Sequence, residues 1–454
     1  MDLLTEPVAE LARRVQAKEL SARELVDASL ARIDELNERF GAFVAVDAEA
    51  ARRAAADLDE RTARGDDPGL LAGIPIGVKD TEDAVGYRTT KGSALHREGP
   101  IAHHDSELVA RLKDAGCIVV GKTNTPELAH KADTTNLLFP HTRNPWNPER
   151  SAGGSSGGSA AAIASGMVPL ATGSDGGGSI RIPSAVCGLS GMKPSLGRVP
   201  HGGAEAPDWQ HLSSKGPMAR RIGDVALALD AVVGPDATDL RSLPMPDVTW
   251  ADAVAEPGVP FRVAWSPDLG YGTTDPGVLA ACERAVRELE GLGAEVVPVD
   301  AVFDEDPGIA WFTMVAAYVA RTVGADADLD ALDPSLRGYV EMGRSLTAVQ
   351  LVEAEDECHR LNVRLVELFH EFRVLVCPTV AGRTPLVGAD AGNWVQYTYP
   401  FNCTRSPAGT VTAGLGDDGM PVGLQVVGPQ HGDQVVLRTI AALEAVIGTF
   451  TWHT

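Results

Sequence analysis

The sequence predicts an α/β fold, in which helices and short apolar strands alternate along one domain. Segments with a helical spacing of apolar residues are followed by short apolar runs with a two-residue period, and this alternation continues to the last helix. Of the 454 residues, 44% are hydrophobic and 22% are charged, which is a globular composition with enough length for a large core. We therefore expect one α/β domain built around a mixed sheet over residues 1–454.

Two helices are predicted near the start of the chain. The segment "SARELVDASLARIDEL", residues 21–36, opens with the spacing of a capping box between Ser21 and Glu24 and continues with apolar residues at helical intervals. A second helix is expected over residues 48–64, because Gly65 then supplies a stop signal.

A strand with a lysine at its end follows these helices. In "LAGIPIGVKD", residues 71–80, Ile74, Ile76 and Val78 alternate with Pro75, Gly77 and Lys79. Lys79 thus lies opposite an apolar row and has small residues beside it. The next segments predict a helix over "LVARLKDAG", stopped by Gly116, and a buried strand over "CIVVG".

The second half of the chain continues the alternation. Its expected strands are "FRVAW", "AEVVPV", "FRVLVCP" and the two arms of a hairpin over residues 409–428 that turns at Asp418-Gly419. The last helix is expected over residues 433–447, and the proline-rich residues 235–260 are expected to form a surface excursion.

The composition excludes several classes of function. A net charge of -23 and a pI near 4.8 disfavour non-specific binding to nucleic acid or to an anionic membrane. The first residues are acidic and lack the apolar core of a secretory signal, so we expect a cytoplasmic protein. The six cysteines lie far apart without a C-x-x-C pair, and no H-E-x-x-H motif occurs. The sequence therefore predicts neither a metal site nor a cofactor.

One short motif matches a nucleotide-binding loop. "GCIVVGKT", residues 116–123, satisfies the pattern G-x-x-x-x-G-K-[ST]. Its four variable positions are apolar and mostly β-branched, so they form the strand itself rather than a loop after a strand. Pro126 also interrupts the helix that should begin at Lys122. An NTPase is thus disfavoured.

Two further motifs match serine enzymes of other classes. "GGSSG", residues 153–157, fits the nucleophile elbow of α/β-hydrolases, but the preceding "RNPWNPERSA" has the composition of a loop instead of the required strand. "SGMK", residues 190–193, fits S-x-x-K without the other motifs of penicillin-binding enzymes.

Two glycine clusters point to a different serine chemistry. The first is "GGSSGG", from residue 153, and the second is Gly176, Gly177 and Gly178, directly before Ser179 and a short helix expected to begin there. Successive glycines let several backbone N–H groups converge, and a helix start adds a positive field. Such a concavity can stabilise an oxyanion.

The segment "GGSSGGSAAAIASGMVPLATGSDGGGSIRIPS", residues 153–184, closely resembles the signature of the amidase signature family. Flanking blocks resemble the family too, so that the likeness covers almost the whole chain, with a signature core of about residues 71–200. These blocks are "LAGIPIGVKD", "GKTNTPEL", "RNPWN", "CGLSGMKPSLGRVP", "KGPMARRIGDVALALDAVVG", "PFNCTRSPAGTVTAG" and "GMPVGLQVVGP".

The resemblance implies a central mixed β-sheet surrounded by α-helices, and hydrolysis of a carboxylic amide by a Ser-Ser-Lys triad. Ser179 would be the nucleophile, Ser155 the bridging serine after a cis peptide bond, and Lys79 the base. The backbone N–H groups of Gly176, Gly177, Gly178 and Ser179 would form the oxyanion hole. A serine hydroxyl both gives and accepts a proton, so this relay dispenses with histidine.

Other residues are assigned supporting or substrate-binding roles. Gly154 obstructs the cis bond least, Ser156 adjoins the bridging serine, and the charged residues Asp175 and Arg181 are expected to brace the loop of the nucleophile. The expected pocket residues are Leu138, Phe139, Trp209 and Trp394.

The sequence does not identify the substrate. The same chemistry serves amides, anilides, esters and carbamates (urethanes), and we expect a small molecule as the partner, with a homodimer as the assembly to test. The alternative is a glutamine amidotransferase component that acts on misacylated tRNA, although relatives of that kind usually read "IRQP" where this chain has Ile182. A catalytically silent binding protein of the same fold is a further alternative.

Overall fold

All strands of the described chain join in one twisted mixed sheet. The computed structural model describes residues 3–209, 211–390 and 392–452. Across its eleven strands the order is β1 (Phe43–Val46), β3 (Ile118–Thr123), β2 (Pro75–Lys79), β4 (Leu170–Asp175), β6 (Ser214–Ala219), β5 (Ser190–Lys193), β10 (Ala408–Leu415), β11 (Pro421–Val427), β9 (Val374–Pro378), β7 (Arg262–Trp265) and β8 (Glu295–Pro298). The expectation of an α/β fold around a mixed sheet is confirmed.

The pairing of the strands divides the sheet into four parts, of which the first is the antiparallel pair of β1 and β3 at one edge. Strand β2 lies between β3 and β4 and is parallel to both. The middle strands from β4 to β9 pair antiparallel, and β9, β7 and β8 are again parallel. Because β2 is covered on both faces, all five of its residues are buried, as expected for a strand inside a parallel layer.

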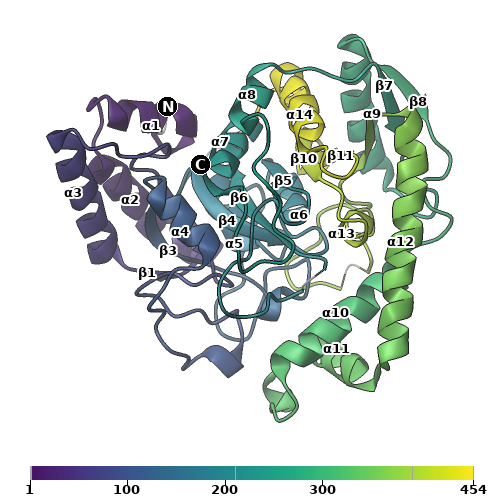
Figure 1. Cartoon of the computed structure of the whole chain (residues 1–454), viewed down its shortest axis with the longest axis horizontal. Coiled ribbons are helices and arrows are strands. Elements are labelled where there is room, and N and C mark those ends of the chain that lie inside the picture. Colours follow the sequence, from purple (N-terminus) through teal and green to yellow (C-terminus); the bar gives the residue numbers. More distant parts are fainter. Residues whose placement is uncertain (1–2, 210, 391, 453–454) are drawn as a thin grey trace.

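Helices surround this sheet, as Figure 1 shows. They are α1 (Val8–Gln16), α2 (Ala22–Phe40), α3 (Ala48–Arg64), α4 (Glu107–Asp114), α5 (Gly157–Ala164), α6 (Arg181–Val186), α7 (Ile222–Val232), α8 (Trp250–Ala255), α9 (Pro276–Gly291), α10 (Gly308–Val323), α11 (Pro334–Ser345), α12 (Ala348–Glu371), α13 (Pro400–Cys403) and α14 (Asp433–Ile447). The long helix α12 runs along one edge of the molecule, beside α10 and α11 (Figure 1).

Local sequence signals explain several helix ends. Ser21 and Glu24 form the predicted capping box at the start of α2. This helix continues past the expected end at residue 36 to Phe40, where Gly41 adopts a left-handed conformation and caps it. The helix α3 ends before Gly65, as predicted.

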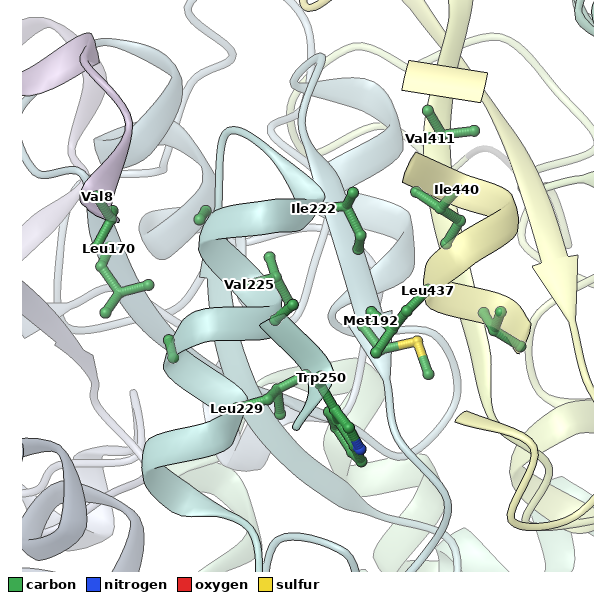
Figure 2. Packing of buried hydrophobic residues seen from close by; sticks show 14 of the residues in the cluster. Val8, Leu170, Met192, Ile222, Val225, Leu229, Trp250, Val411, Leu437 and Ile440 are labelled. Atoms are coloured by element: carbon green, nitrogen blue, oxygen red, sulfur yellow. The ribbon is translucent and has the colours of Figure 1, made fainter. Parts of the chain in front are cut away.

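The largest core lies on one face of the sheet. Figure 2 shows Ile222, Val225 and Leu229 of α7 directed toward the same cluster as Leu437 and Ile440 of α14. Trp250 of α8 enters this cluster and is 1% exposed. Residues 235–260 are therefore more than a surface excursion, because a helix within them contributes a large aromatic ring to the core.

We predict that Leu229→Ala lowers the free energy of unfolding by about 2–5 kcal/mol, since the side chain is fully buried and its loss leaves a cavity. The matched variant Leu240→Ala removes the same atoms from a fully exposed position and should leave that free energy nearly unchanged. Urea denaturation of both variants checks this, and equal effects would contradict the core packing described for α7.

Candidate functional site

The topology of the sheet brings the predicted lysine and the second glycine cluster together. Strands β2 and β4 are parallel neighbours, so their carboxyl ends lie at the same edge of the sheet. Lys79 is the last residue of β2, and Gly176 follows the last residue of β4. The backbone N–H of Lys79 donates to Oγ1 of Thr172 at 2.8 Å, which joins the two strand ends.

Ser155 and Ser156 reach the same edge from the start of α5. The peptide bond between Gly154 and Ser155 is cis, as the resemblance implies. A Cβ atom at Gly154 would lie 2.8 Å from backbone atoms of residues 131–133, so the first glycine cluster permits a close approach of two chain segments. This packing directs both serine side chains toward Lys79.

Three hydroxyl groups surround the amine of Lys79. Its Nζ atom lies 2.7 Å from Oγ of Ser155, 2.8 Å from Oγ of Ser156 and 2.9 Å from Oγ of Ser174. A neutral amine has two N–H donors and one lone pair, which matches three hydroxyl neighbours. Such a group can take a proton from one hydroxyl while the other two hold it in place.

Burial favours the neutral form of this lysine. Lys79 is fully buried, and desolvation lowers its pKa from 10.5 to about 7, although the carboxylates of Glu82 and Asp175 act in the opposite direction. A lysine with this pKa is partly neutral near pH 7 and can act as a base.

The second glycine cluster allows aromatic side chains to approach the loop before Ser179. A Cβ atom at Gly176 would lie 2.6 Å from the indole of Trp209, and one at Gly177 would overlap the indole of Trp311. Gly178 has a φ of +124°, which other residues rarely adopt. The helix after Ser179, α6, begins at Arg181, two residues later than expected.

The N–H groups of this loop differ in availability. The N–H of Gly178 donates to Oδ1 of Asp175 at 2.8 Å, so this group, expected in the oxyanion hole, is already engaged. Within the described part of the chain, the N–H groups of Gly176, Gly177 and Ser179 have no hydrogen-bond acceptor. Those three donors are the ones free to meet an oxyanion.

Asp175 and Arg181 form a fully buried ion pair beneath this loop. The guanidinium contacts both carboxylate oxygens, at 2.8 and 2.9 Å. Burial opposes the charged carboxylate, but Arg181 and its hydrogen bonds hold the pKa of Asp175 below its usual value. Arg181 also donates to the Thr398 carbonyl and to the side chains of Gln425 and Asn402. The charges are therefore paired and hydrogen-bonded, as buried charges require.

A cavity of about 700 Å³ opens above these groups and includes Ser155, Ser174, Gly176 and Ser179 in its wall. Of the four expected pocket residues, Trp209 lines this cavity, whereas Leu138, Phe139 and Trp394 do not. The N–H groups of Leu138 and Phe139 both donate to Oδ1 of Asn136, which folds that segment into a turn away from the cavity.

Sequence reasoning missed other groups at the site. Ser174 could have been noticed, because it is the last residue but one of a strand, and its hydroxyl lies at the same sheet edge as Lys79. The sequence analysis assigned no role to the residues of the apolar wall and of the charged wall. They are Leu128 and Val319, and the ion pairs Lys215–Glu82 and Lys91–Asp208.

Two of the three disfavoured motifs, "GCIVVGKT" and "SGMK", occupy structural positions. Lys122 lies inside β3 and pairs with the buried Asp80 at 3.0 Å, so "GCIVVGKT" forms a strand. Ser190 and Lys193 lie in β5, where Ser190 donates to Glu444 and Lys193 to the carbonyl of Pro194. None of these groups faces the cavity.

No group of three or more His, Cys, Asp and Glu side chains in the described residues is placed to hold a metal ion. No described helix is long and apolar enough to span a membrane.

Three comparisons relate this chain to known proteins. The family model described as Amidase matches residues 24–437. An acylamidase of Rhodococcus erythropolis is 36% identical over 458 residues, covering 96% of this chain and 94% of that protein. A glutamyl-tRNA(Gln) amidotransferase subunit of Salinispora tropica is 35% identical over 491 residues, covering 99% of each. The crystal structure of a bacterial aryl acylamidase of the amidase signature enzymes has a TM-score of 0.91 at 28% identity, covering 98% of this chain and 97% of that one.

We predict that Arg181→Met destabilises the protein by about 3–5 kcal/mol, because it leaves the buried carboxylate of Asp175 without its counter-charge. Arg337→Met removes an arginine from exposed ion pairs with Asp330 and Glu341 and serves as the matched control. Urea unfolding measures both, and a control that loses as much stability as Arg181→Met would argue against the bracing role.

Proposed function

Because the chain belongs to the amidase signature family of amide hydrolases, we propose that it is a stand-alone amidase. It cleaves the carbon–nitrogen bond of a small carboxylic amide through a serine acyl-enzyme. The observation that carries this proposal is the buried amine of Lys79, whose pKa is lowered to about 7 and which lies 2.7 Å from the hydroxyl of Ser155. A base in contact with a hydroxyl at a cavity wall is what activation of a serine requires.

In the first half-reaction, Ser179 Oγ attacks the amide carbonyl carbon. Its proton passes to Ser155 as Ser155 gives its own to Lys79 Nζ. The carbonyl oxygen becomes an oxyanion, which the free N–H groups of Gly176, Gly177 and Ser179 stabilise. The carbon–nitrogen bond then breaks, and the proton returns through Ser155 to the departing amine.

In the second half-reaction, water replaces the amine. The neutral Lys79 accepts a proton from water through Ser155, and the resulting hydroxide attacks the acyl carbon. Collapse of the second tetrahedral intermediate returns the proton to Ser179 Oγ and releases the carboxylic acid. Anilides, esters and carbamates pass through similar oxyanions, so the same groups would serve them.

The cavity and the relatives both support a small organic amide as the substrate. A volume of about 700 Å³ with apolar and polar walls is suited to a small organic molecule. The acylamidase and aryl acylamidase relatives are named for amide substrates.

The second candidate is a glutamine amidotransferase component, supported by the Salinispora relative. Ile182, where such relatives usually have glutamine, is buried beside the loop.

A panel of amides, anilides, esters, carbamates and free glutamine tests the proposal, with Ser179→Ala as the control for background hydrolysis. We expect release of amine from a neutral amide or anilide. Turnover of glutamine alone among the panel would favour the amidotransferase component instead.

We predict that Lys79→Met lowers kcat by roughly 10²–10⁴-fold, because the base is lost. Lys193→Met is the matched control. Lys193 is equally buried, and its pKa is likewise lowered to about 7, first by desolvation, but it does not line the cavity. Its replacement should leave kcat within a few-fold of the wild type. Near-normal turnover by Lys79→Met would refute the relay.

The pH dependence follows from the same pKa. Only neutral Lys79 can accept a proton, so kcat/KM should rise with pH along a limb centred near pH 7. The folded pKa lies below the unfolded value of 10.5, so this lysine opposes folding at neutral pH, and the penalty fades as pH rises from 7 to 10.5. Lys79→Met should therefore melt no lower than the wild type at pH 7.

We predict that an aryl phosphonate or sulfonyl fluoride modifies Ser179, since this serine adjoins the free N–H donors while Ser155 contacts the base. Peptide mass spectrometry of the adduct checks this, and Ser179→Ala should abolish the modification. An adduct on Ser155 would reverse the two roles, and an unreactive protein would indicate a silent binding protein.

A further inference from the structure

Nine consecutive residues, 201–209, line the cavity. They belong to the connection between β5 and β6, which are antiparallel neighbours. Such neighbours need only a short turn, yet residues 194–213 join them here, and connections of this length are commonly functional. Gly202 and Gly203, with φ of +57° and +89°, give the segment two points where it bends.

A single carboxylate holds this segment to both sides of the cavity. Asp208 accepts a hydrogen bond from Lys91 Nζ at 2.8 Å on one side. On the other side it accepts from Thr322 Oγ1 at 3.1 Å and from Arg321 at 3.3 Å, both on α10. Arg321 also donates to the carbonyl of Pro207. Asp208 thus joins two parts of the chain that lie more than 200 residues apart.

The ion pairs of Asp208 are exposed to solvent and can break and re-form. The side chains of Lys91 and Asp208 are 26% and 44% exposed, and the side chain of Arg321 is 41% exposed. Ion pairs with such exposure are weak and are screened by salt. A segment that covers a cavity must open to admit substrate and release product, so contacts of this strength suit it better than a buried ion pair would.

Trp209, the residue after Asp208, contacts the glycine loop before Ser179. Trp209 has a φ of +54°, a conformation that a bulky residue adopts only when its surroundings hold it there. Its indole packs directly on Gly176 and lies 6.1 Å, between ring centroids, from that of Trp311. Trp311 in turn donates to the carbonyl of Gly176 at 2.8 Å. The glycine loop is therefore held from two sides by indoles.

We propose that residues 201–209 form a lid over the cavity and that Asp208 is the positioning residue that latches it, seating Trp209 on the glycine loop. Closure would both cover a small substrate and fix the N–H donors beside Ser179. The inference rests on the proposed function and adds to it a cause of size selectivity: a bulky amide must be bound with the latch open.

Hydrogen–deuterium exchange of the intact protein tests the latch without any substrate. In Asp208→Asn, exchange of residues 201–209 should accelerate by roughly fivefold, because the charged contacts are lost. Asp208→Glu keeps the carboxylate and should stay near the wild type. Asp304→Asn, which loses an exposed ion pair to Arg364, should leave the segment unchanged. Salt should accelerate this exchange in the wild type but not in Asp208→Asn. Unchanged exchange in Asp208→Asn would overturn the latch.

Kinetics test the coupling to the reaction. The ratio of kcat/KM for a long-chain acyl anilide to that for acetanilide should rise by about threefold or more in Asp208→Asn and return in Asp208→Glu. Loss of folded enzyme lowers both values alike and cannot move this ratio. An unchanged ratio would overturn the lid. A wild type that hydrolyses no amide would count against the proposed function, while the exchange experiment would still decide the latch.

Discussion

A carboxylate and a guanidinium, both removed from water, face each other between the end of β4 and the start of α6. Desolvation of Asp175 and Arg181 costs more than their attraction alone returns, so the pair persists because hydrogen bonds satisfy the remaining polar atoms. The loop before Ser179 supplies one of those hydrogen bonds, since the Gly178 N–H donates to Asp175. The position of Ser179 and of its free N–H neighbours thus follows from the solvation of one buried ion pair.

The same balance of burial and charge sets the properties of the lysines. Lys79 and Lys193 are both fully buried with a pKa near 7, yet only Lys79 has three hydroxyl neighbours and a cavity beside it. Lys122 is equally buried but pairs with Asp80. A lowered lysine pKa therefore does not identify a base by itself. The hydroxyls of Ser155 and Ser174, which also line the cavity, make the distinction.

Structural features that depend only on residues nearby in the chain were predictable from the sequence. The capping box of α2, the stop at Gly65 and the strand that carries Lys79 depend on neighbours in the chain, and the structure confirms them. The pocket walls combine segments that lie far apart in the chain, so no local pattern tells which of their residues line the cavity. Aromatic type alone did not separate Trp209 from Trp394. The engagement of Gly178 by Asp175 was likewise hidden, because a run of glycines does not tell which N–H points inward.

The partners of Arg181 have a consequence for the order in which the protein is made. Lys79, Ser155 and Ser179 have all left the ribosome long before Thr398, Asn402 and Gln425 are synthesised. Until those residues are made, the guanidinium of Arg181 lacks most of its acceptors, and a buried charge without partners is strongly unfavourable. A nascent or truncated chain therefore carries the three residues of the proposed triad but not the support that arranges them. The arrangement on which the proposed hydrolysis depends is complete only once Gln425 has been made.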